Sequence, residues 1–376
     1  MGRYETRGHP KPLAFVRRVV ESGRPPHALL LTGPARVGKA TLARDLAAGL
    51  LCLAADPAER PCRECSACRK LEHGNHPDLH LLAPQGAGGQ IRLGQVQALA
   101  GELALLPLEG RFRVAIVERA QRLNIDAQNA LLKTLEEPPA ETCIVLAADD
   151  GTGLLATVVS RCARLRLGPV ASDSLIGLLE ERGAADAVRG AALARLAGGR
   201  PGLALALAGA PEAVILRAGL ARTLISLLQA DRWRRLAAQA ELLDDAAALA
   251  RLSEGTTEGE AQDDAAPDGR NGPEPSRQRR NSPAERRAAV AALIAVWRDV
   301  ARDLALAARG ARSELVLRDL LDELVEAAPR TDSGSMGRFL QRLDNLGRAV
   351  DAYANPELVL DVLLLEWPST PAVSAA

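Results

Sequence analysis

The chain has 376 residues, and its 47 Lys and Arg residues are balanced by 47 Asp and Glu residues. This length allows two or three domains, and the even charge balance excludes a global electrostatic attraction to nucleic acid or to a membrane surface. No apolar run approaches the ~20 residues of a membrane span, and the N-terminus lacks a signal-peptide core, so we expect a cytoplasmic protein with no membrane partner.

The first part of the chain predicts a nucleotide-binding loop. An amphipathic helix is expected at Pro12–Ser22, and a short buried strand at Ala28–Leu31 leads into the sequence GPARVGKAT, from Gly33 to Thr41. Glycine, four residues and then Gly-Lys between a strand and a helix is the phosphate-binding loop, or P-loop. Its backbone amides close around phosphates, and its lysine, Lys39, reaches the terminal phosphates.

One position of this loop departs from the motif. The Ser or Thr that ligates Mg²⁺ directly after the lysine is Ala40 here. Thr41 comes one residue too late, because a helix turns each successive side chain by about 100°. We therefore expect weak or residual nucleotide binding, with a glycine-rich turn that binds nothing as the alternative. The candidate nucleotide-binding residues are Gly33, Gly38, Lys39, Ala40 and Thr41.

Four of the six cysteines gather in one stretch after this loop. Cys52, Cys62, Cys65 and Cys68 form the pattern C-x9-C-x2-C-x2-C. Four thiolates with two close spacings can surround Zn²⁺ tetrahedrally, and a closed all-sulfur site is structural rather than catalytic. We therefore predict one structural zinc site in residues 52–68. Four reduced surface cysteines are the alternative.

Further apolar runs predict a parallel sheet. Strands are expected at Leu79–Leu82, Val114–Val117, Cys143–Ala147 and Arg164–Leu167. One helix is expected at Leu93–Leu106, and another runs from a cap at Asn124 or Asp126 to the breaker Pro138-Pro139. Strand, helix and strand with short connections favour a parallel sheet, and the loops at its strand ends carry the chemistry.

Two motifs in this region point to one family. The sequence AQNALLKTLEEPP, from Ala127 to Pro139, followed by Ser160-Arg161-Cys162, resembles the clamp-loader branch of the AAA+ ATPases. The resemblance implies an α/β N-terminal AAA+ domain with a RecA-like, five-stranded parallel sheet, then a small helical lid and an all-α collar domain for oligomerisation. Bacterial clamp-loader subunits also carry a zinc module at the place of the four cysteines. The domain boundaries implied are 1–168, 169–209 and 210–376.

From Gly168 onward the pattern is purely helical. The lid helices are expected at Asp173–Arg182, Ala187–Leu196 and Pro201–Ala208, and the collar helices at Pro211–Leu252, Pro283–Arg309, Glu314–Ala327, Gly337–Tyr353 and Pro356–Leu365. Asn355 is a good N-cap for the last of these helices. Residues 253–282 lack large apolar side chains, so we expect a disordered, solvated insertion there. A tether that binds DNA or a partner is the alternative.

The resemblance also shows that two catalytic positions of the family are altered. In an active AAA+ ATPase the central strand ends in Asp-Glu, whose carboxylates hold Mg²⁺ through water and activate the attacking water. The pair is Glu118-Arg119 here. A guanidinium cannot accept a proton, so this degenerate Walker B motif lacks the general base. The position of the nucleotide-sensing arginine of the lid aligns with Leu203.

The family's Ser-Arg-Cys motif assigns a role in trans to Arg161. In AAA+ rings the nucleotide lies at the seam between subunits, and the resemblance implies that Arg161 is an arginine finger for the ATP site of a neighbour. Guanidinium suits this role because it is permanently charged and binds phosphate oxygens bidentately. A surface arginine paired with a local carboxylate is the alternative.

The substitutions at Ala40, Arg119 and Leu203 resemble those of the non-hydrolysing stator subunit of the bacterial DNA polymerase III clamp loader. The implied partners are the gamma/tau ATPase subunits and the delta subunit in a hetero-pentamer, the sliding clamp, and primer–template DNA through the complex. Zn²⁺ is the expected structural cofactor. One alternative is an active gamma/tau-type ATPase. The other, a zinc-dependent nucleic-acid-binding module, needs aromatic residues beside the cysteines, and the sequence has none there.

Overall fold

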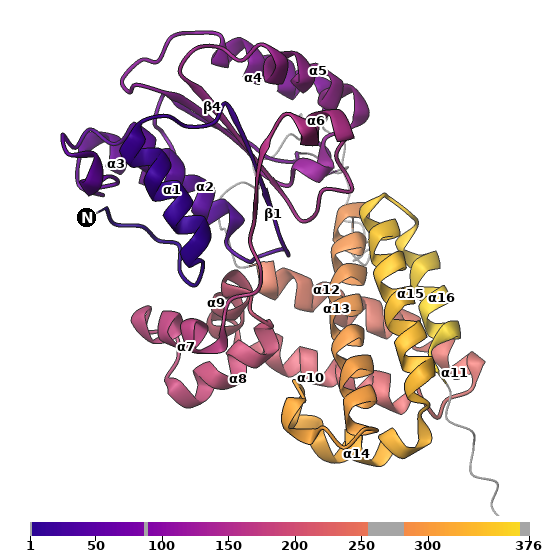
Figure 1. Cartoon of the computed structure of the whole chain (residues 1–376). Coiled ribbons are helices and arrows are strands. Elements are labelled where there is room, and N and C mark those ends of the chain that lie inside the picture. Colours follow the sequence, from indigo (N-terminus) through magenta and orange to yellow (C-terminus); the bar gives the residue numbers. More distant parts are fainter. Residues whose placement is uncertain (1, 86–88, 255–281, 369–376) are drawn as a thin grey trace, which may run out of the picture. The chain divides into compact units, whose positions relative to one another are not determined.

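The computed structural model describes residues 2–85, 89–254 and 282–368 (Figure 1). The chain forms two compact units, Met1–Leu205 and Ala206–Ala376. The predicted division into three domains places a further boundary at residue 168 and stays a prediction. Most of the predicted disordered insertion, residues 255–281, lies outside the described residues.

The first unit is built on a five-stranded parallel sheet, as predicted. Its strands are β1 (Ala28–Thr32), β2 (Leu79–Leu82), β3 (Arg113–Val117), β4 (Thr142–Ala148) and β5 (Ala163–Arg166). They lie in the order β2-β3-β4-β1-β5, and the paired strands are parallel. The two neighbouring strands β3 and β4 are buried at every residue, as expected for strands covered on both faces.

Helices cover both faces of this sheet. The pair α1 (Pro10–Ser22) and α2 (Lys39–Leu51) packs on one face, and the pair α4 (Leu93–Leu103) and α5 (Ile125–Glu136) on the other (Figure 1). Side chains alternate along a strand, so Val114 and Ile116 of β3 contact the first pair while Ala115 and Val117 contact the second. This arrangement holds the ends of β1, β3 and β4 fixed beside one another.

Two predicted helix caps are confirmed. The Asn124 side chain accepts a hydrogen bond from the backbone N–H of Ala127 at the start of α5, so Asn124 rather than Asp126 is the N-cap. Asn355 accepts from the N–H groups of Glu357 and Leu358 at the start of α16 (Pro356–Glu366). In both cases an asparagine oxygen satisfies amide groups that have no partner within the helix.

The remaining helices of the first unit include three that form the predicted lid. These are α7 (Ser172–Glu181), α8 (Ala187–Ala197) and α9 (Pro201–Gly209), whose last residues belong to the second unit. Short elements that the sequence did not predict are α3 (Ser66–Glu72), α6 (Ala156–Ser160) and the 3-10 turns Pro57–Glu59 and Ala120–Arg122. The helix predicted to reach Leu106 ends at Leu103 instead, and the carbonyl of Leu106 accepts from the Arg113 guanidinium.

The described part of the second unit is all-helical, as predicted. Its helices are α10 (Pro211–Ser226), α11 (Arg232–Ala237), α12 (Gln239–Glu254), α13 (Pro283–Ala307), α14 (Leu321–Ala327), α15 (Ser333–Asp351) and α16. Its core holds three of the chain's eight aromatic residues, Trp297, Phe339 and Trp367. Their rings pack together, with centroids 4.8–5.7 Å apart. The Trp367 indole also donates to the carbonyl of Leu224.

The prediction of one helix over Glu314–Ala327 is wrong in its first half. Only 3-10 turns, Arg312–Glu314 and Arg318–Leu320, precede α14. The buried carboxylate of Asp303 on α13 accepts from the N–H groups of Val316 and Leu317. These amide groups are therefore held outside a regular helix by a residue distant in sequence, which a local pattern does not reveal.

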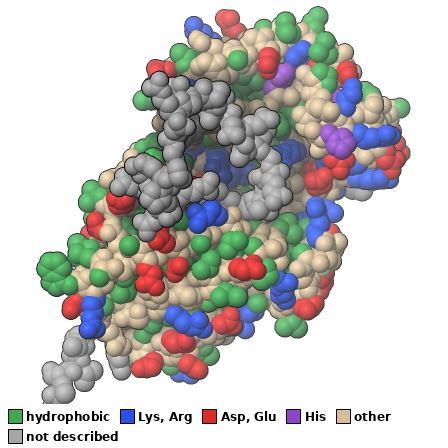
Figure 2. All heavy atoms as spheres, turned by 180° about the vertical axis from the view of Figure 1, so that it is seen from behind, with side chains coloured by type: hydrophobic (Ala, Val, Ile, Leu, Met, Phe, Trp, Pro, Cys, Tyr) green, Lys and Arg blue, Asp and Glu red, His purple; other side chains and the backbone are tan. Residues whose placement is uncertain are grey.

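The surface agrees with the balanced composition. On the described surface of the face in Figure 2, basic and acidic side chains are interspersed. Among the described residues, no single helix is long and apolar enough to cross a membrane; α9 and α10 meet that test only as a pair, bent by 103°.

Candidate functional site

The backbone conformation of the P-loop requires glycine at both glycine positions of the motif. Gly33 has φ +151° and Gly38 has φ +109°, conformations that side chains rarely allow. A Cβ atom on Gly33 would lie 2.2 Å from the carbonyl oxygen of Leu167, the residue after β5. The loop is also held by His9, whose ring nitrogen contacts the carbonyl of Val37 at 2.8 Å. The sequence therefore forms a phosphate-loop conformation at the carboxyl end of β1.

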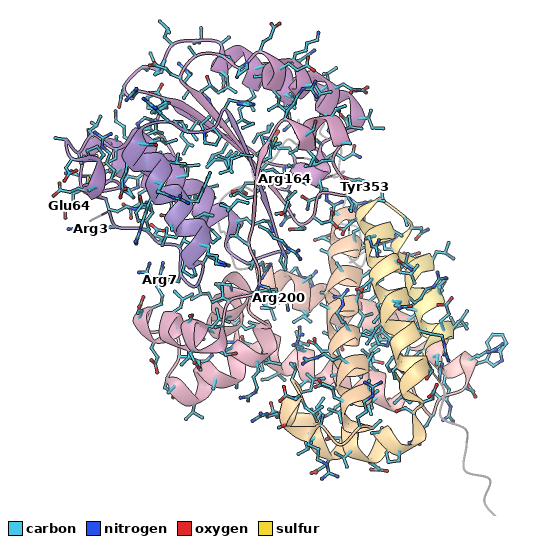
Figure 3. The ribbon with its side chains drawn as sticks, viewed as in Figure 1. Arg3, Arg7, Glu64, Arg164, Arg200 and Tyr353 are labelled. Atoms are coloured by element: carbon cyan, nitrogen blue, oxygen red, sulfur yellow. The ribbon has the colours of Figure 1, made fainter. Side chains whose placement is uncertain are left out.

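A cavity of about 410 Å³ opens over this loop within the first unit. The charged side chains that line it are Glu5, Arg7, Arg36, Lys39, Glu118, Arg119, Arg122, Asp149 and Arg182. Six of these nine are cationic, so the lining favours anions. Arg7 comes from the N-terminal segment, as Figure 3 shows. On the lid side the cavity is bounded by the first turn of α9, where the N–H of Gly202 donates to the carbonyl of Arg36.

Lys39, the predicted phosphate-binding residue, is engaged by the protein itself. Its ammonium donates to the carbonyl oxygens of Gly33 at 2.7 Å and Pro34 at 2.9 Å, and to the Asp149 carboxylate at 2.8 Å. The side chain is only 10% exposed. The other predicted loop residues, Ala40 and Thr41, also line the cavity, but Ala40 offers no oxygen ligand for Mg²⁺.

The degenerate Walker B pair lies at the edge of the same cavity. Glu118 follows β3, and its carboxylate pairs with Arg44 of α2 at 3.0 Å. Arg119 is exposed and has φ +51°, so the chain turns sharply where an active enzyme of this class holds its general base. The structure brings both predicted residues to the cavity, and neither one supplies a free base beside Lys39.

Asp149, the residue after β4, is a further polar residue of the cavity that no sequence motif indicated. One carboxylate oxygen accepts from Lys39, and the other accepts from the side-chain amide of Gln121, at 2.8 and 2.9 Å. The signal for this contact was the order of the strands. Because β4 lies beside β1, the residue after β4 must lie beside the P-loop.

Arg161 lies in the turn between α6 and β5. Its guanidinium pairs with Glu136 at the end of α5 at 2.6 Å and donates to the carbonyl of Thr157 at 3.0 Å. The side chain is 35% exposed and does not line the cavity over the chain's own P-loop. Both predicted roles, a finger for a neighbouring subunit and a local ion pair, are compatible with this position.

The four cysteines form one cluster, which we call the cysteine knuckle, residues 52–68. Their sulfur atoms all lie within 4.8 Å of one another, and the closest pairs are 3.5–4.0 Å apart. Four sulfurs at about 2.3 Å from a central Zn²⁺ would be separated by about 3.8 Å. Four free thiols at this spacing therefore fit a tetrahedral metal ion.

The backbone around the knuckle favours thiolates. The N–H groups of Ala54, Cys62, Cys65 and Cys68 point at cysteine sulfurs, with N···S distances of 3.4–3.5 Å. Burial alone would raise the pKa of Cys62, yet the neighbouring N–H groups and thiols lower it to about 6. Burial raises the pKa of Cys52 and Cys68 instead. A metal ion bound here would supply the positive charge that stabilises all four thiolates.

The knuckle is tied to the rest of the first unit through Asp45. This α2 carboxylate is fully buried and accepts from the guanidinium of Arg63, which lies between two of the cysteines. It also accepts from the backbone N–H groups of Glu5 and Thr6. Figure 3 shows a second link, the ion pair of Arg3 with Glu64. The N-terminal segment that borders the cavity is thus held by the knuckle.

Leu203 and Arg200 lie at or just before the start of α9. Leu203, aligned with the family's sensor arginine, is buried in α9 and does not line the cavity. Arg200 lies just before α9, and its Nε atom donates to the carbonyl of Ala197. The side of α9 that borders the cavity carries Pro201, Gly202 and Leu205.

A P-loop after β1, a parallel sheet in the order β2-β3-β4-β1-β5 and a helical lid together define the AAA+ class of P-loop proteins. Within that class, residues 8–171 match the model of the family described as DNA polymerase III, delta subunit. This match covers less than half of the chain, and curated relatives of the same region include delta-prime subunits.

The chain is similar to curated delta-prime subunits over the same region. It is 35% identical to DNA polymerase III subunit delta' of Bacillus subtilis over 46% of this chain and 51% of that protein. It is 43% identical to the Pseudomonas aeruginosa delta' subunit over 37% and 42% of the respective chains, and 35% identical to the Escherichia coli delta' subunit over 50% and 56%. The chain thus spans about half the length of the curated relatives that it matches.

Among solved structures, the chain resembles a Thermotoga maritima protein described as DNA polymerase III, gamma subunit-related. The two are 18% identical, the alignment covers 95% of this chain and 98% of that chain, and the TM-score is 0.42. A likeness at this level carries no argument about function.

Proposed function

We propose that this chain is a delta-prime-type subunit of a bacterial clamp loader. It acts as a non-hydrolysing stator in a hetero-pentamer with gamma/tau-type ATPase subunits and a delta subunit. The complex opens a sliding clamp and closes it on primer–template DNA. The observation that carries this proposal is a well-formed P-loop cavity whose lysine is held by the protein and whose Mg²⁺-ligand and base positions are Ala40 and Arg119.

The altered cavity can at most bind a nucleoside triphosphate, and it lacks the groups that hydrolysis needs. Hydrolysis of a nucleoside triphosphate needs a metal ion to neutralise developing charge and a residue that positions the attacking water. Ala40 cannot ligate the metal, and a guanidinium at Arg119 cannot accept a proton. The sheet, the loop and the lid remain intact around these changes, so the fold is suited to a rigid element of a ring.

We assign the arginine finger to Arg161. Its side chain is partly exposed outside the chain's own cavity, at the residue that directly follows α6. The Glu136 carboxylate holds the guanidinium in place in the isolated chain, and an incoming phosphate chain offers a more highly charged partner. Such a finger stabilises transition-state charge at the neighbour's ATP site.

We assign the cysteine knuckle to Zn²⁺ in a structural role. Four sulfur donors fill a tetrahedral site and leave no open position for a substrate. A short segment with so few apolar residues has little other source of stability, and metal binding is coupled to folding in such segments. The bound ion supplies charge and geometry only, and the knuckle then holds the N-terminal segment through Arg63 and Asp45.

The proposal is tested by reconstituting the loader. The tagged chain is mixed with the gamma/tau and delta subunits of its own organism, and the mass of the complex and its loading of a clamp onto primed DNA are measured. We expect a pentamer with one copy of this chain, and loading that depends on it. A protein that alone turns over ATP at about one per second, with loss of that turnover in Lys39→Ala, is an active motor of the gamma/tau type and overturns the stator proposal.

A further inference from the structure

The contact between Asp149 and Lys39 arises from the register of the sheet. Strand β4 pairs with β1 so that Ala148 lies opposite Thr32. Asp149 is the residue directly after β4, and Gly33, the first P-loop residue, is the residue directly after β1. The N–H of Gly33 donates to the backbone carbonyl of Asp149 at 3.2 Å. The carboxylate is therefore placed against the P-loop by the fold.

No donor of Lys39 is left over for a ligand. An ammonium group has three N–H donors, and here they reach two P-loop carbonyls and the Asp149 carboxylate. The carbonyl contacts bend the side chain back over its own loop. The carboxylate is the one anionic partner of the three, and it sits where the lysine of a P-loop meets the terminal phosphates.

Asp149 is also held from its other side. The second carboxylate oxygen of Asp149 accepts from the side-chain NH₂ group of Gln121 at 2.9 Å. The side-chain Oε1 of Gln121 in turn accepts from the backbone N–H of Asp149 at 3.3 Å. Gln121 belongs to the 3-10 turn after the Glu118-Arg119 pair. Residues that follow β3 and β4 thus lie beside Lys39 of the loop that follows β1. The Asp149 carboxylate cannot turn away from the lysine without breaking its hydrogen bonds with Gln121.

We propose that Asp149 is a specificity-determining residue that occupies the place of the terminal phosphate on Lys39. It excludes nucleoside triphosphates from a cavity whose other charges favour them. A triphosphate must break the Lys39–Asp149 ion pair and then lie beside an unpaired carboxylate. The inference rests on the proposed function and deepens it, because it names the residue that would weaken triphosphate binding in the cavity of a non-hydrolysing subunit.

The substitution at Ala40 does not have the same effect. Loss of the Mg²⁺ ligand weakens only those contacts that pass through the metal ion, whereas the backbone amides and the lysine of a P-loop bind phosphate oxygens directly. Ala40 thus acts through the metal and Arg119 on hydrolysis, while Asp149 acts on binding even without Mg²⁺. The two effects are separable by experiment.

The test measures equilibrium binding of ATP and ADP, with and without Mg²⁺, to the full chain and to Asp149→Asn. The matched control is Asp150→Asn, which removes one charge at the next residue. The Asp150 side chain accepts from Thr152 and does not line the cavity. We expect Asp149→Asn to tighten ATP binding by about tenfold or more, with a smaller gain for ADP, and Asp150→Asn to change it less than about threefold.

A double variant separates the effect of the Lys39–Asp149 ion pair from the general effect of removing one negative charge. Adding Lys39→Ala to Asp149→Asn should abolish the gain, because the released lysine is what binds the phosphate. Asp149→Ser, checked by thermal unfolding, repeats the test if the Asn variant is unstable. The inference is overturned if ATP binds the two Asn variants equally, if no variant binds ATP, or if the gain survives Lys39→Ala. ATP turnover by Asp149→Asn would instead count against the stator proposal, since Ala40 and Arg119 are unchanged.

Discussion

The cysteine knuckle and the P-loop cavity are both ligand-site motifs, yet the structure treats them differently. In the knuckle, four free thiols place their sulfur atoms within 4.8 Å of one another. In the cavity, the lysine that defines the motif is paired with Asp149 and two carbonyls. The geometry of the knuckle fits a metal ion, whereas the lysine of the cavity is already paired within the protein.

The difference teaches that a motif specifies a loop conformation and not whether its ligand position is free. The spacing of the cysteines places four equivalent donors, and the ligand follows from the donors alone. The spacing of Gly33, Gly38 and Lys39 places the loop, but the partner of the lysine comes from another strand.

The largest effect is expected from Cys68→Ser, which removes one of four equivalent sulfur donors. We predict one Zn²⁺ per chain in the wild type and none in the variant, with loss of structure around residues 52–68, because structural zinc sites contribute on the order of 10 kcal/mol to folding. Elemental analysis and near-ultraviolet absorption after cobalt substitution give the readout. Cys162→Ala, at a buried cysteine outside the knuckle, should keep its zinc. Zinc-free wild-type protein purified under reducing conditions would contradict the assignment.

A smaller effect is expected from Asp45→Asn. This change weakens the link between Arg63 of the knuckle and the N-terminal segment, because a neutral amide replaces a fully buried carboxylate. We predict a loss of about 3 kcal/mol in the free energy of unfolding, the usual cost of removing one partner of a buried pair. Amide exchange at residues 2–7 should accelerate while the zinc content stays at one per chain. Exchange rates equal to those of the wild type would show that the knuckle does not hold this segment.

The smallest effect is expected from Asn124→Ala, a change that touches neither ligand site. It removes the N-cap of α5 and should lower the free energy of unfolding by about 1 kcal/mol. Zinc content and ATP binding should be unaltered, which makes this variant the reference for a purely structural loss. A change in either quantity would mean that destabilisation alone reaches the two sites, and the larger effects would then need correction for it.

The parts of the molecule that depend on local pattern were predictable from the sequence. The apolar run Val114–Val117 is a buried strand, Asn124 is a cap, and the four cysteines lie together. The parts that depend on distant partners were not. The region after Arg312 is irregular because the Asp303 carboxylate accepts hydrogen bonds from its backbone N–H groups. Asp149 lies beside Lys39 because β4 pairs with β1. The short helix α3 was missed because seven residues carry little periodic signal.

Under the proposed function, this chain acts at its neighbour's ATP site and not at its own. The most direct measurement is single-turnover ATP hydrolysis by the reconstituted loader, with clamp and primed DNA, carrying wild-type chain, Arg161→Ala or Glu136→Gln. Glu136→Gln removes the local ion pair of Arg161 but keeps the guanidinium. We predict that Arg161→Ala slows hydrolysis at the adjacent site by on the order of 10³-fold, while Glu136→Gln retains it. Equal rates for wild type and Arg161→Ala, or an equal loss in both variants, would contradict the claim.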